Sequence, residues 1–180
     1  MPQTKTIMDA KAIDDAITML GEQIVSRHQE IKGLALIGIH TRGVFLAERL
    51  CDKINQITGK SPLRGVVDIN LYRDDWTRIS HHPVIRSTKI EFPIDDMKLL
   101  MVDDVLFTGR TARAAMEAII DFGRPCLIEL CVLVDRGHRE LPIHADYAGK
   151  KIKTKRSDLI NVLLVETDGI DRVEHVISDK

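Results

Sequence analysis

The residues with the most chemical character lie in one stretch, Leu99–Thr111 (LLMVDDVLFTGRT). Apolar residues lead to two adjacent carboxylates, Asp103 and Asp104, and the run Thr108–Thr111 (TGRT) follows a few residues later. If a strand ends at the acidic pair and a helix opens after it, the free N–H groups of the helix start and the two threonine hydroxyls form a cradle for one phosphate group. Gly109 permits backbone angles that other residues avoid.

The acidic pair indicates which phosphate compound fits. Two carboxylates aimed at a phosphate would repel it, but they can accept hydrogen bonds from the hydroxyls of a ribose whose 5′-phosphate lies in the cradle. Acidic pairs also cap helices and Thr-Gly-x-Thr also forms plain turns, so only the two features together indicate a sugar phosphate. Arg110 stands where a Walker motif has its lysine, and no GxGxxG follows a strand, which argues against both of those nucleotide-binding motifs.

The elements that position these residues follow from the apolar periodicity. Apolar runs predict buried parallel strands at Leu34–Ile39, Val66–Tyr72, Lys98–Val102 and Cys126–Val134. Spacings of three and four predict helices at Asp9–Glu30, Val44–Ile57 and Gly109–Phe122, the first with Asp9 as N-cap. Two late strands are expected at Val162–Val165 and Val173–Ile177, with a turn at Asp168-Gly169 between them. This order predicts an α/β fold with parallel neighbouring strands and a ligand crevice at their carboxyl ends.

Composition limits the classes of protein that the chain can belong to. With 180 residues, 44% of them hydrophobic, the chain suits one well-buried domain. Its net charge of −1 argues against nucleic-acid binding through bulk charge, although not against a local basic patch. No apolar run approaches the roughly 18 residues that span a bilayer, and the first residues lack the apolar core of a signal peptide. Cys51, Cys126 and Cys131 show no CxxC spacing and are expected to be reduced core residues of a cytoplasmic protein.

Residues 73–91 break the periodicity, with charges, two histidines and a proline. A connection of this length is unusual in a compact domain and is typical of a lid or a binding loop. His81 and His82 are adjacent, so their side chains point in different directions, and no second cluster accompanies them. We therefore expect a solvated loop rather than a metal site.

Three separated motifs resemble one known family. Val102–Thr111 (VDDVLFTGRT) resembles the phosphoribosyl-pyrophosphate (PRPP) binding motif of type I phosphoribosyltransferases, and His40-Thr41-Arg42-Gly43 resembles that family's pyrophosphate loop. Asp68–Asp75 and Leu133–Pro142 are similar to segments of the PyrR family, whose members are pyrimidine-operon attenuation proteins and uracil phosphoribosyltransferases. The resemblance covers nearly the whole chain.

The resemblance implies a fold and a reaction. The implied fold is the type I phosphoribosyltransferase fold, a twisted parallel sheet with helices on both faces, in a single domain spanning residues 1–180. A flexible loop at about 73–91 and a small C-terminal hood at about 136–180 belong to it. The implied reaction converts uracil and PRPP, with Mg²⁺, to UMP and pyrophosphate. The resemblance also implies a homodimer or a higher homo-oligomer, with no membrane contact. A purine phosphoribosyltransferase with the same PRPP site remains an alternative.

The resemblance also implies roles for particular residues. Asp103, Asp104 and Arg42 would serve catalysis, and Arg136 and Ile160 would lie near the base, Arg136 also near the pyrophosphate. Asp135 would help to position magnesium through water, although a solvated cap explains it equally well. The implied PRPP-binding residues are Thr41, Arg42, Gly43, Val102, Asp103, Asp104, Val105, Leu106, Phe107, Thr108, Gly109, Arg110 and Thr111. In this family the pyrophosphate loop often contains a cis peptide bond that does not precede proline.

A regulatory role would require binding of the pyrimidine leader mRNA. Four positions match that expectation, namely Thr18 and Arg27 on the outer face of the first helix, Arg139, and Lys150. Three positions depart from the family, because Met19 and Glu22 replace basic or imidazole side chains and His144 replaces an arginine. Glu22 would repel phosphate. The basic run 150–156 is equally consistent with a solvated strand edge. An attenuator that keeps the pocket only as a sensor is therefore the second hypothesis beside the enzyme.

Overall fold

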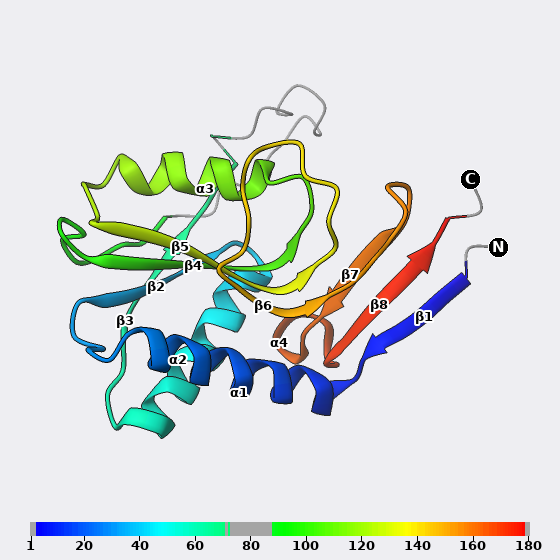
Figure 1. Cartoon of the computed structure of the whole chain (residues 1–180), viewed down its shortest axis with the longest axis horizontal. Coiled ribbons are helices and arrows are strands. Elements are labelled where there is room, and N and C mark those ends of the chain that lie inside the picture. Colours follow the sequence, from blue (N-terminus) through cyan, green and yellow to red (C-terminus); the bar gives the residue numbers. More distant parts are fainter. Residues whose placement is uncertain (1–2, 71, 73–87, 179–180) are drawn as a thin grey trace.

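The computed structural model describes residues 3–70, 72 and 88–178. Its main sheet is parallel, with the strand order β3-β2-β4-β5-β6 (Figure 1). These strands are β2 (Leu34–Ile39), β3 (Leu63–Val67), β4 (Lys98–Leu106), β5 (Leu127–Asp135) and β6 (Tyr147–Lys151). The α/β prediction is confirmed.

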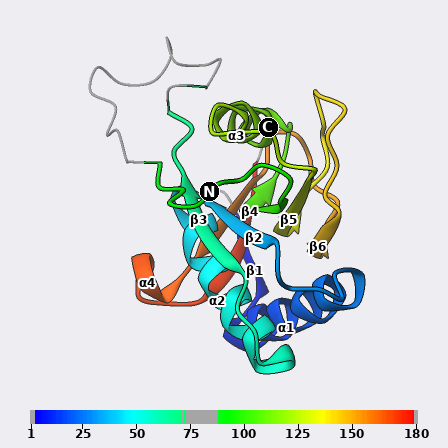
Figure 2. The same ribbon diagram turned by 90° about the vertical axis from the view of Figure 1, so that its left-hand side faces the viewer.

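Helices cover both faces of this sheet (Figures 1 and 2). They are α1 (Ala10–Arg27), α2 (Arg42–Thr58) and α3 (Arg110–Ile120). One core cluster joins the sheet to α1 and α2 through residues such as Leu20, Leu50 and Leu100. A second cluster joins it to α3 through Met101 and Ile119. Each such side chain contributes about 1.5–3 kcal/mol when fully buried, so consecutive residues of β4 stabilise opposite layers.

A three-stranded antiparallel sheet lies beside the main sheet, in the order β1-β8-β7. It consists of β1 (Gln3–Met8), β7 (Leu159–Leu163) and β8 (Arg172–Ile177), and the short helix α4 (Val165–Asp168) connects β7 to β8. Strand β1 is not predicted from the sequence, because most of it is exposed and it has no buried apolar run to indicate it. The antiparallel sheet therefore joins strands from the segment expected to form the hood with a strand near the N-terminus (Figure 1).

Local hydrogen bonds explain two errors in the predicted strands. The strand predicted at Val66–Tyr72 ends at Val67, because the Asp68 side chain accepts a hydrogen bond from Asn70 N and turns the chain. Ile69 is buried, which explains its strand-like pattern. The strand predicted at Val162–Val165 ends at Leu163, since α4 begins directly after it.

Other boundaries also differ from the prediction. β4 continues to Leu106, so Asp103 and Asp104 lie inside the strand rather than after it. Helix α1 has the predicted N-cap, with the Asp9 carboxylate accepting from Ala12 N at 2.8 Å. Cys51 and Cys131 are buried as expected, whereas Cys126 is exposed.

The loop expected at 73–91 lies outside the described residues except for 88–91, and His81 and His82 lie outside them as well. Lys89, in the described end of the expected loop, forms an antiparallel bridge with Val66. In the described ranges, every helix is too short or too polar to span a membrane.

Candidate active site

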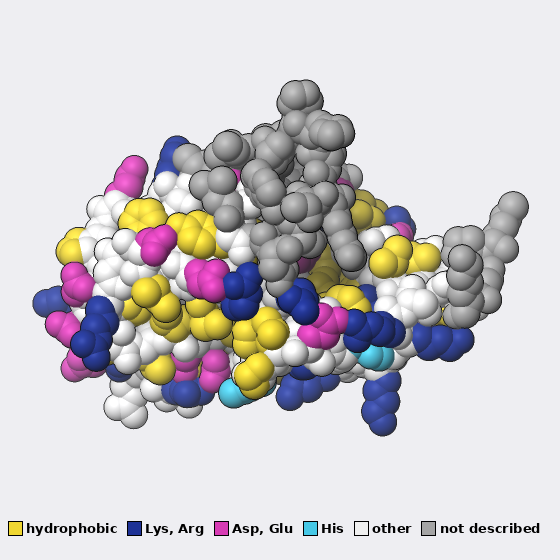
Figure 3. Space-filling view, turned by 90° about the horizontal axis from the view of Figure 1, so that it is seen from above, with side chains coloured by type: hydrophobic (Ala, Val, Ile, Leu, Met, Phe, Trp, Pro, Cys, Tyr) yellow, Lys and Arg dark blue, Asp and Glu magenta, His cyan; other side chains and the backbone are white. Residues whose placement is uncertain are grey.

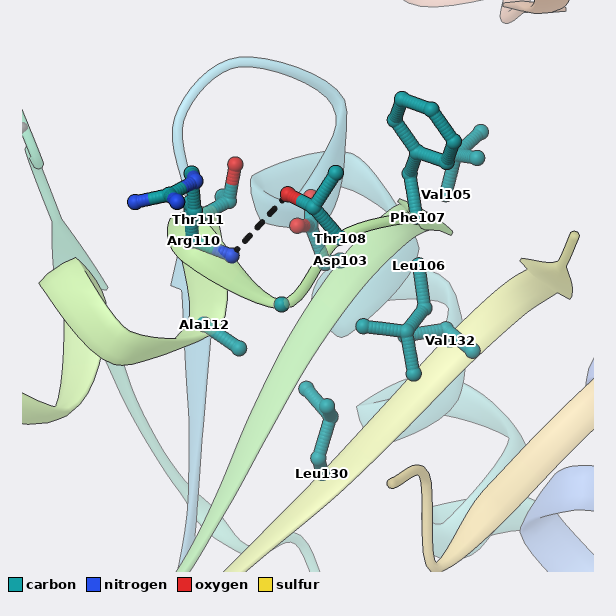
Figure 4. A pocket seen from close by; sticks show the side chains of 11 residues that line it. Asp103, Val105, Leu106, Phe107, Thr108, Arg110, Thr111, Ala112, Leu130 and Val132 are labelled. Atoms are coloured by element: carbon teal, nitrogen blue, oxygen red, sulfur yellow. Dashed lines mark hydrogen bonds between the residues drawn. The ribbon is translucent and has the colours of Figure 1, made fainter. Parts of the chain in front are cut away.

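The predicted phosphate cradle lies at the carboxyl end of β4. Gly109 has a φ of +92°, a left-handed angle that glycine adopts without a steric penalty, and α3 begins at the next residue. Thr108 Oγ1 accepts a hydrogen bond from Arg110 N at 3.4 Å (Figure 4). A cavity of about 260 Å³ opens here, lined by Asp103, residues 105–112, Leu130 and Val132. Hydroxyls, backbone N–H groups of the first helical turn and one carboxylate therefore share one hollow.

The acidic pair is held by the backbone next to it. Asp103 Oδ1 accepts from Asp104 N at 2.9 Å, and Asp104 Oδ1 accepts from Val105 N at 2.8 Å. Asp103 lines the cavity beside Thr108, as Figure 4 shows, whereas Asp104 is not among its lining residues. Burial, together with the neighbouring charge of Asp104, holds the pKa of Asp103 well above its usual value. Asp103 therefore retains its proton to a higher pH than an isolated aspartate would.

The predicted pyrophosphate loop, residues 40–43, follows β2 and includes Arg42 and Gly43, the first two residues of α2; it contains a cis peptide bond between His40 and Thr41. A Cβ atom added to Gly43 would lie only 2.2 Å from the carbonyl oxygen of Val102 and 3.2 Å from Cα of Asp103. Only a glycine lets the loop approach β4 this closely. The packing of Gly43 thus brings the loop against the strand segment that carries the acidic pair.

Residues after β5 brace the cradle from outside. The Arg139 guanidinium donates to the carbonyl oxygens of Phe107 (2.8 Å) and Ile143 (3.0 Å) and pairs with Asp135 at 2.6 Å. Glu140 pairs with Arg110 at 2.7 Å and also with Arg156. Sequence reasoning missed the role of Glu140, and its only signal was the similarity of the surrounding segment to the PyrR family.

Comparison with known proteins decides the family. The family model described as "Phosphoribosyl transferase domain" matches residues 3–164. The chain is 53% identical to "Bifunctional protein PyrR" of Desulfosudis oleivorans, over 96% of each protein. It is 51% identical to the protein of the same name from Acetivibrio thermocellus, over 96% of this chain and 93% of that protein. The chain belongs to the PyrR family of phosphoribosyltransferases.

Solved structures confirm the fold. The hypoxanthine phosphoribosyltransferase of Trypanosoma cruzi matches with a TM-score of 0.74 at 16% identity, over 97% of both chains. A hypoxanthine phosphoribosyltransferase from Staphylococcus aureus matches with a TM-score of 0.71 at 19% identity, over 97% of this chain and 93% of that chain. This PyrR-family chain therefore has the type I phosphoribosyltransferase fold.

The two residues expected near the base in this PyrR-family chain lie in different surroundings. Arg136 is only 4% exposed, and its guanidinium lies 4.1 Å from the centroid of the Phe107 ring. It also donates to the carbonyl oxygen of Lys155 at 2.9 Å. Ile160 is partly buried on β7 and packs against the core of α1 and α2. Arg136 thus connects the cradle to the segment before β7, and direct contact of either residue with a base stays a prediction.

The four RNA candidates of this PyrR-family chain lie on three segments. Thr18 is partly exposed on α1. Arg27 lies nine residues further along that helix, which places it about 180° around the helix axis from Thr18. Its guanidinium pairs with Glu129 at 2.8 Å. The two residues therefore do not share the outer face of α1, contrary to the expectation. Arg139 holds the backbone of Phe107, a residue that lines the cavity, and Lys150 is exposed on β6.

Proposed function

We propose that this chain transfers a 5-phosphoribosyl group from PRPP to uracil, giving UMP and pyrophosphate. One observation carries the proposal, namely the contact of Gly43 with the backbone of Val102 and Asp103. This contact places a loop suited to diphosphate beside the acidic pair, and the monophosphate cradle lies at the end of the same strand. PRPP has the same order of groups, with a diphosphate, a ribose diol and a 5′-phosphate.

In the proposed reaction, a uracil nitrogen bonds to the anomeric carbon as the bond from that carbon to the diphosphate oxygen breaks, and the proton of that nitrogen passes to water or to the released diphosphate. Positive charge develops on the ribose, and negative charge develops on the leaving group. Asp103 and Asp104 hold the ribose hydroxyls and place negative charge beside the developing cation. Arg42 and the backbone N–H groups of the loop bind the departing diphosphate. Catalysis then depends on position and electrostatics, without a nucleophilic side chain.

Phosphoribosyltransferases generally use Mg²⁺ with PRPP, and Mg²⁺ prefers carboxylate and phosphate oxygens. The carboxylate of Asp135, at the end of β5, is a donor of this type and accepts a hydrogen bond from Gly137 N at 3.0 Å. We assign it a magnesium contact through water. The bound cation would neutralise part of the charge on the departing diphosphate.

An assay of base consumption tests the enzyme proposal directly. Purified protein with PRPP and Mg²⁺ is expected to convert uracil to UMP and to leave hypoxanthine and guanine unchanged, because the relatives at about 50% identity are PyrR proteins. Nucleotide products are separated by chromatography. Conversion of a purine base in place of uracil would support the purine alternative instead, and consumption of no base would support the sensor-only pocket.

We further propose that the UMP-loaded protein binds the pyrimidine leader mRNA, as a cytoplasmic homodimer or higher homo-oligomer. The relatives named "Bifunctional protein PyrR" support this proposal. Helix α1 and the basic strand β6 are neighbours, since a Cβ on Gly149 would lie 3.3 Å from Cβ of Ala16. Figure 3 shows the α3 side of the molecule, away from α1, and there basic and acidic side chains are intermixed, in keeping with the net charge of −1. A local contact rather than a broad basic surface would hold the RNA.

Glu22→Gln is expected to tighten binding of the leader transcript about fivefold. Removing one like charge beside a phosphate recovers about 1 kcal/mol. Filter binding at several salt concentrations, with and without UMP, measures the effect. Asp52→Asn changes the net charge equally on an exposed site of α2 and serves as the matched control. If both variants tighten binding equally, α1 does not contact the RNA, and no UMP-dependent binding at low salt would refute the regulatory proposal.

A further inference from the structure

We propose that Asp168 is a positioning residue, whose carboxylate holds the guanidinium of Arg42 in place for the diphosphate. This inference rests on the proposed function, because it concerns the same diphosphate site. It connects the short helix α4, distant in sequence, with the first residue of α2, which belongs to the predicted pyrophosphate loop.

The contact between the two side chains is bidentate. Arg42 Nη2 donates to Asp168 Oδ1 at 2.9 Å and to Oδ2 at 3.1 Å, and Arg42 Nε donates to Oδ2 at 3.2 Å. A guanidinium carries five N–H donors in a planar fork. Asp168 therefore occupies the Nε–Nη2 edge, and among the described residues the structure shows no acceptor for the N–H groups of Nη1, which can face an anion. One edge fixes the orientation of the group, and the other edge can bind.

Asp168 is itself held firmly. Its Oδ2 accepts from Leu164 N at 2.9 Å and from Thr167 Oγ1 at 2.7 Å. These hydrogen bonds, together with the one from Arg42, lower the pKa of Asp168 to about 2. The carboxylate is thus ionised throughout the neutral range, and it provides a fixed counter-ion for Arg42.

Two further ion pairs, both made by Arg49, fasten the same helix without involving Arg42. Arg49, two turns along α2 from Arg42, pairs with Glu166 at 2.7 Å and with Asp171 at 2.8 Å. This cluster attaches α4 to α2. Because α4 is attached independently, loss of the Asp168 carboxylate would release Arg42 while α4 stays in place. The cluster also supplies a matched control, since Asp171 contacts Arg49 and Val165 N rather than Arg42.

Asp168→Asn is expected to weaken binding of inorganic diphosphate with Mg²⁺ about tenfold, as measured by calorimetry. The KM for PRPP is expected to rise by a similar factor, while the KM for uracil stays the same. Asp171→Asn is expected to change none of these three values. Asp168→Glu, which keeps the charge, is expected to restore part of the affinity.

A double-mutant comparison tests whether Asp168 acts through Arg42. In an Arg42→Ala background, Asp168→Asn should cause no further loss of diphosphate affinity. The inference is overturned if the two losses add, if Asp168→Asn binds diphosphate as well as or better than the wild type, or if Asp171→Asn causes an equal loss. If Asp168→Asn does not fold, Thr167→Val removes one donor to Asp168, and unchanged affinity in that variant would also overturn it.

The experiment separates this inference from the proposed function. Diphosphate binding needs no turnover, so a protein that binds diphosphate through Arg42 and Asp168 but makes no UMP would refute only the proposed reaction. A wild type that makes UMP while Asp168→Asn keeps full affinity would refute only the role of Asp168.

Discussion

Asp103→Asn and Asp104→Asn are each expected to lower the turnover number for UMP formation by about 100-fold or more. Losing one preorganised electrostatic group at a developing charge typically costs two to three orders of magnitude. The described hydrogen bonds of both carboxylates run to adjacent backbone N–H groups, which an asparagine oxygen also accepts. The substitutions therefore remove charge and leave the local structure in place. Steady-state kinetics with PRPP and uracil measure the effect.

The stability of Asp103→Asn provides the control. Because burial raises the pKa of Asp103, the folded wild type binds its proton more tightly than the unfolded chain does. The wild type therefore loses stability as the pH rises from the unfolded pKa of about 4 to the folded pKa. The variant has no such loss, so its melting temperature should exceed that of the wild type above this window, with the advantage shrinking as the pH falls. A variant that is less stable at pH 8, or that turns over at the wild-type rate, would contradict this assignment.

Gly43→Ala is expected to abolish most of the activity and to destabilise the fold. The new Cβ would lie 2.2 Å from the carbonyl oxygen of Val102, a backbone atom that cannot move aside as a flexible side chain can. The loop must then move away from β4, and overpacking of this kind costs about 1–3 kcal/mol or more. We expect a loss of at least about 100-fold in kcat/KM for PRPP and a lower free energy of unfolding in urea.

Gly59→Ala serves as the control for this prediction. Gly59 ends α2 with a φ of +70°, and a Cβ atom added to it would have no neighbour within 4 Å, so alanine there adds backbone strain alone. That strain costs about 1–2 kcal/mol. Activity should be unchanged in Gly59→Ala. Equal loss of activity in both variants would show that the close approach of Gly43 to β4 is not needed for catalysis.

Much of the site could be predicted because it depends on local patterns. The apolar run of β4, the acidic pair and Gly109 are contiguous, and the ends of neighbouring parallel strands necessarily meet at one edge of the sheet. The end of β4 was harder to predict, because carboxylates inside a buried strand look in the sequence like the end of that strand.

Contacts between distant segments could not be predicted in the same way. No local pattern indicates that Asp168 holds Arg42, because the two side chains meet only after α4 packs beside α2. The same holds for the buried position of Arg136, which depends on the ring of Phe107 and the carbonyl of Lys155. Composition also gave no indication of β1, because its residues are mostly polar and its partner is the last strand of the chain.

The pairing of β1 with β8 has a consequence for synthesis of the protein. Gln3 is in register with Ile177, so β1 is synthesised long before its partner β8 and must wait for it. The parallel sheet can assemble earlier, but the three-stranded sheet closes only when β8 has emerged. A nascent chain would therefore form the phosphate cradle before α4, the helix that holds Arg42, is in place. Its full affinity for diphosphate would develop only after the antiparallel sheet has closed.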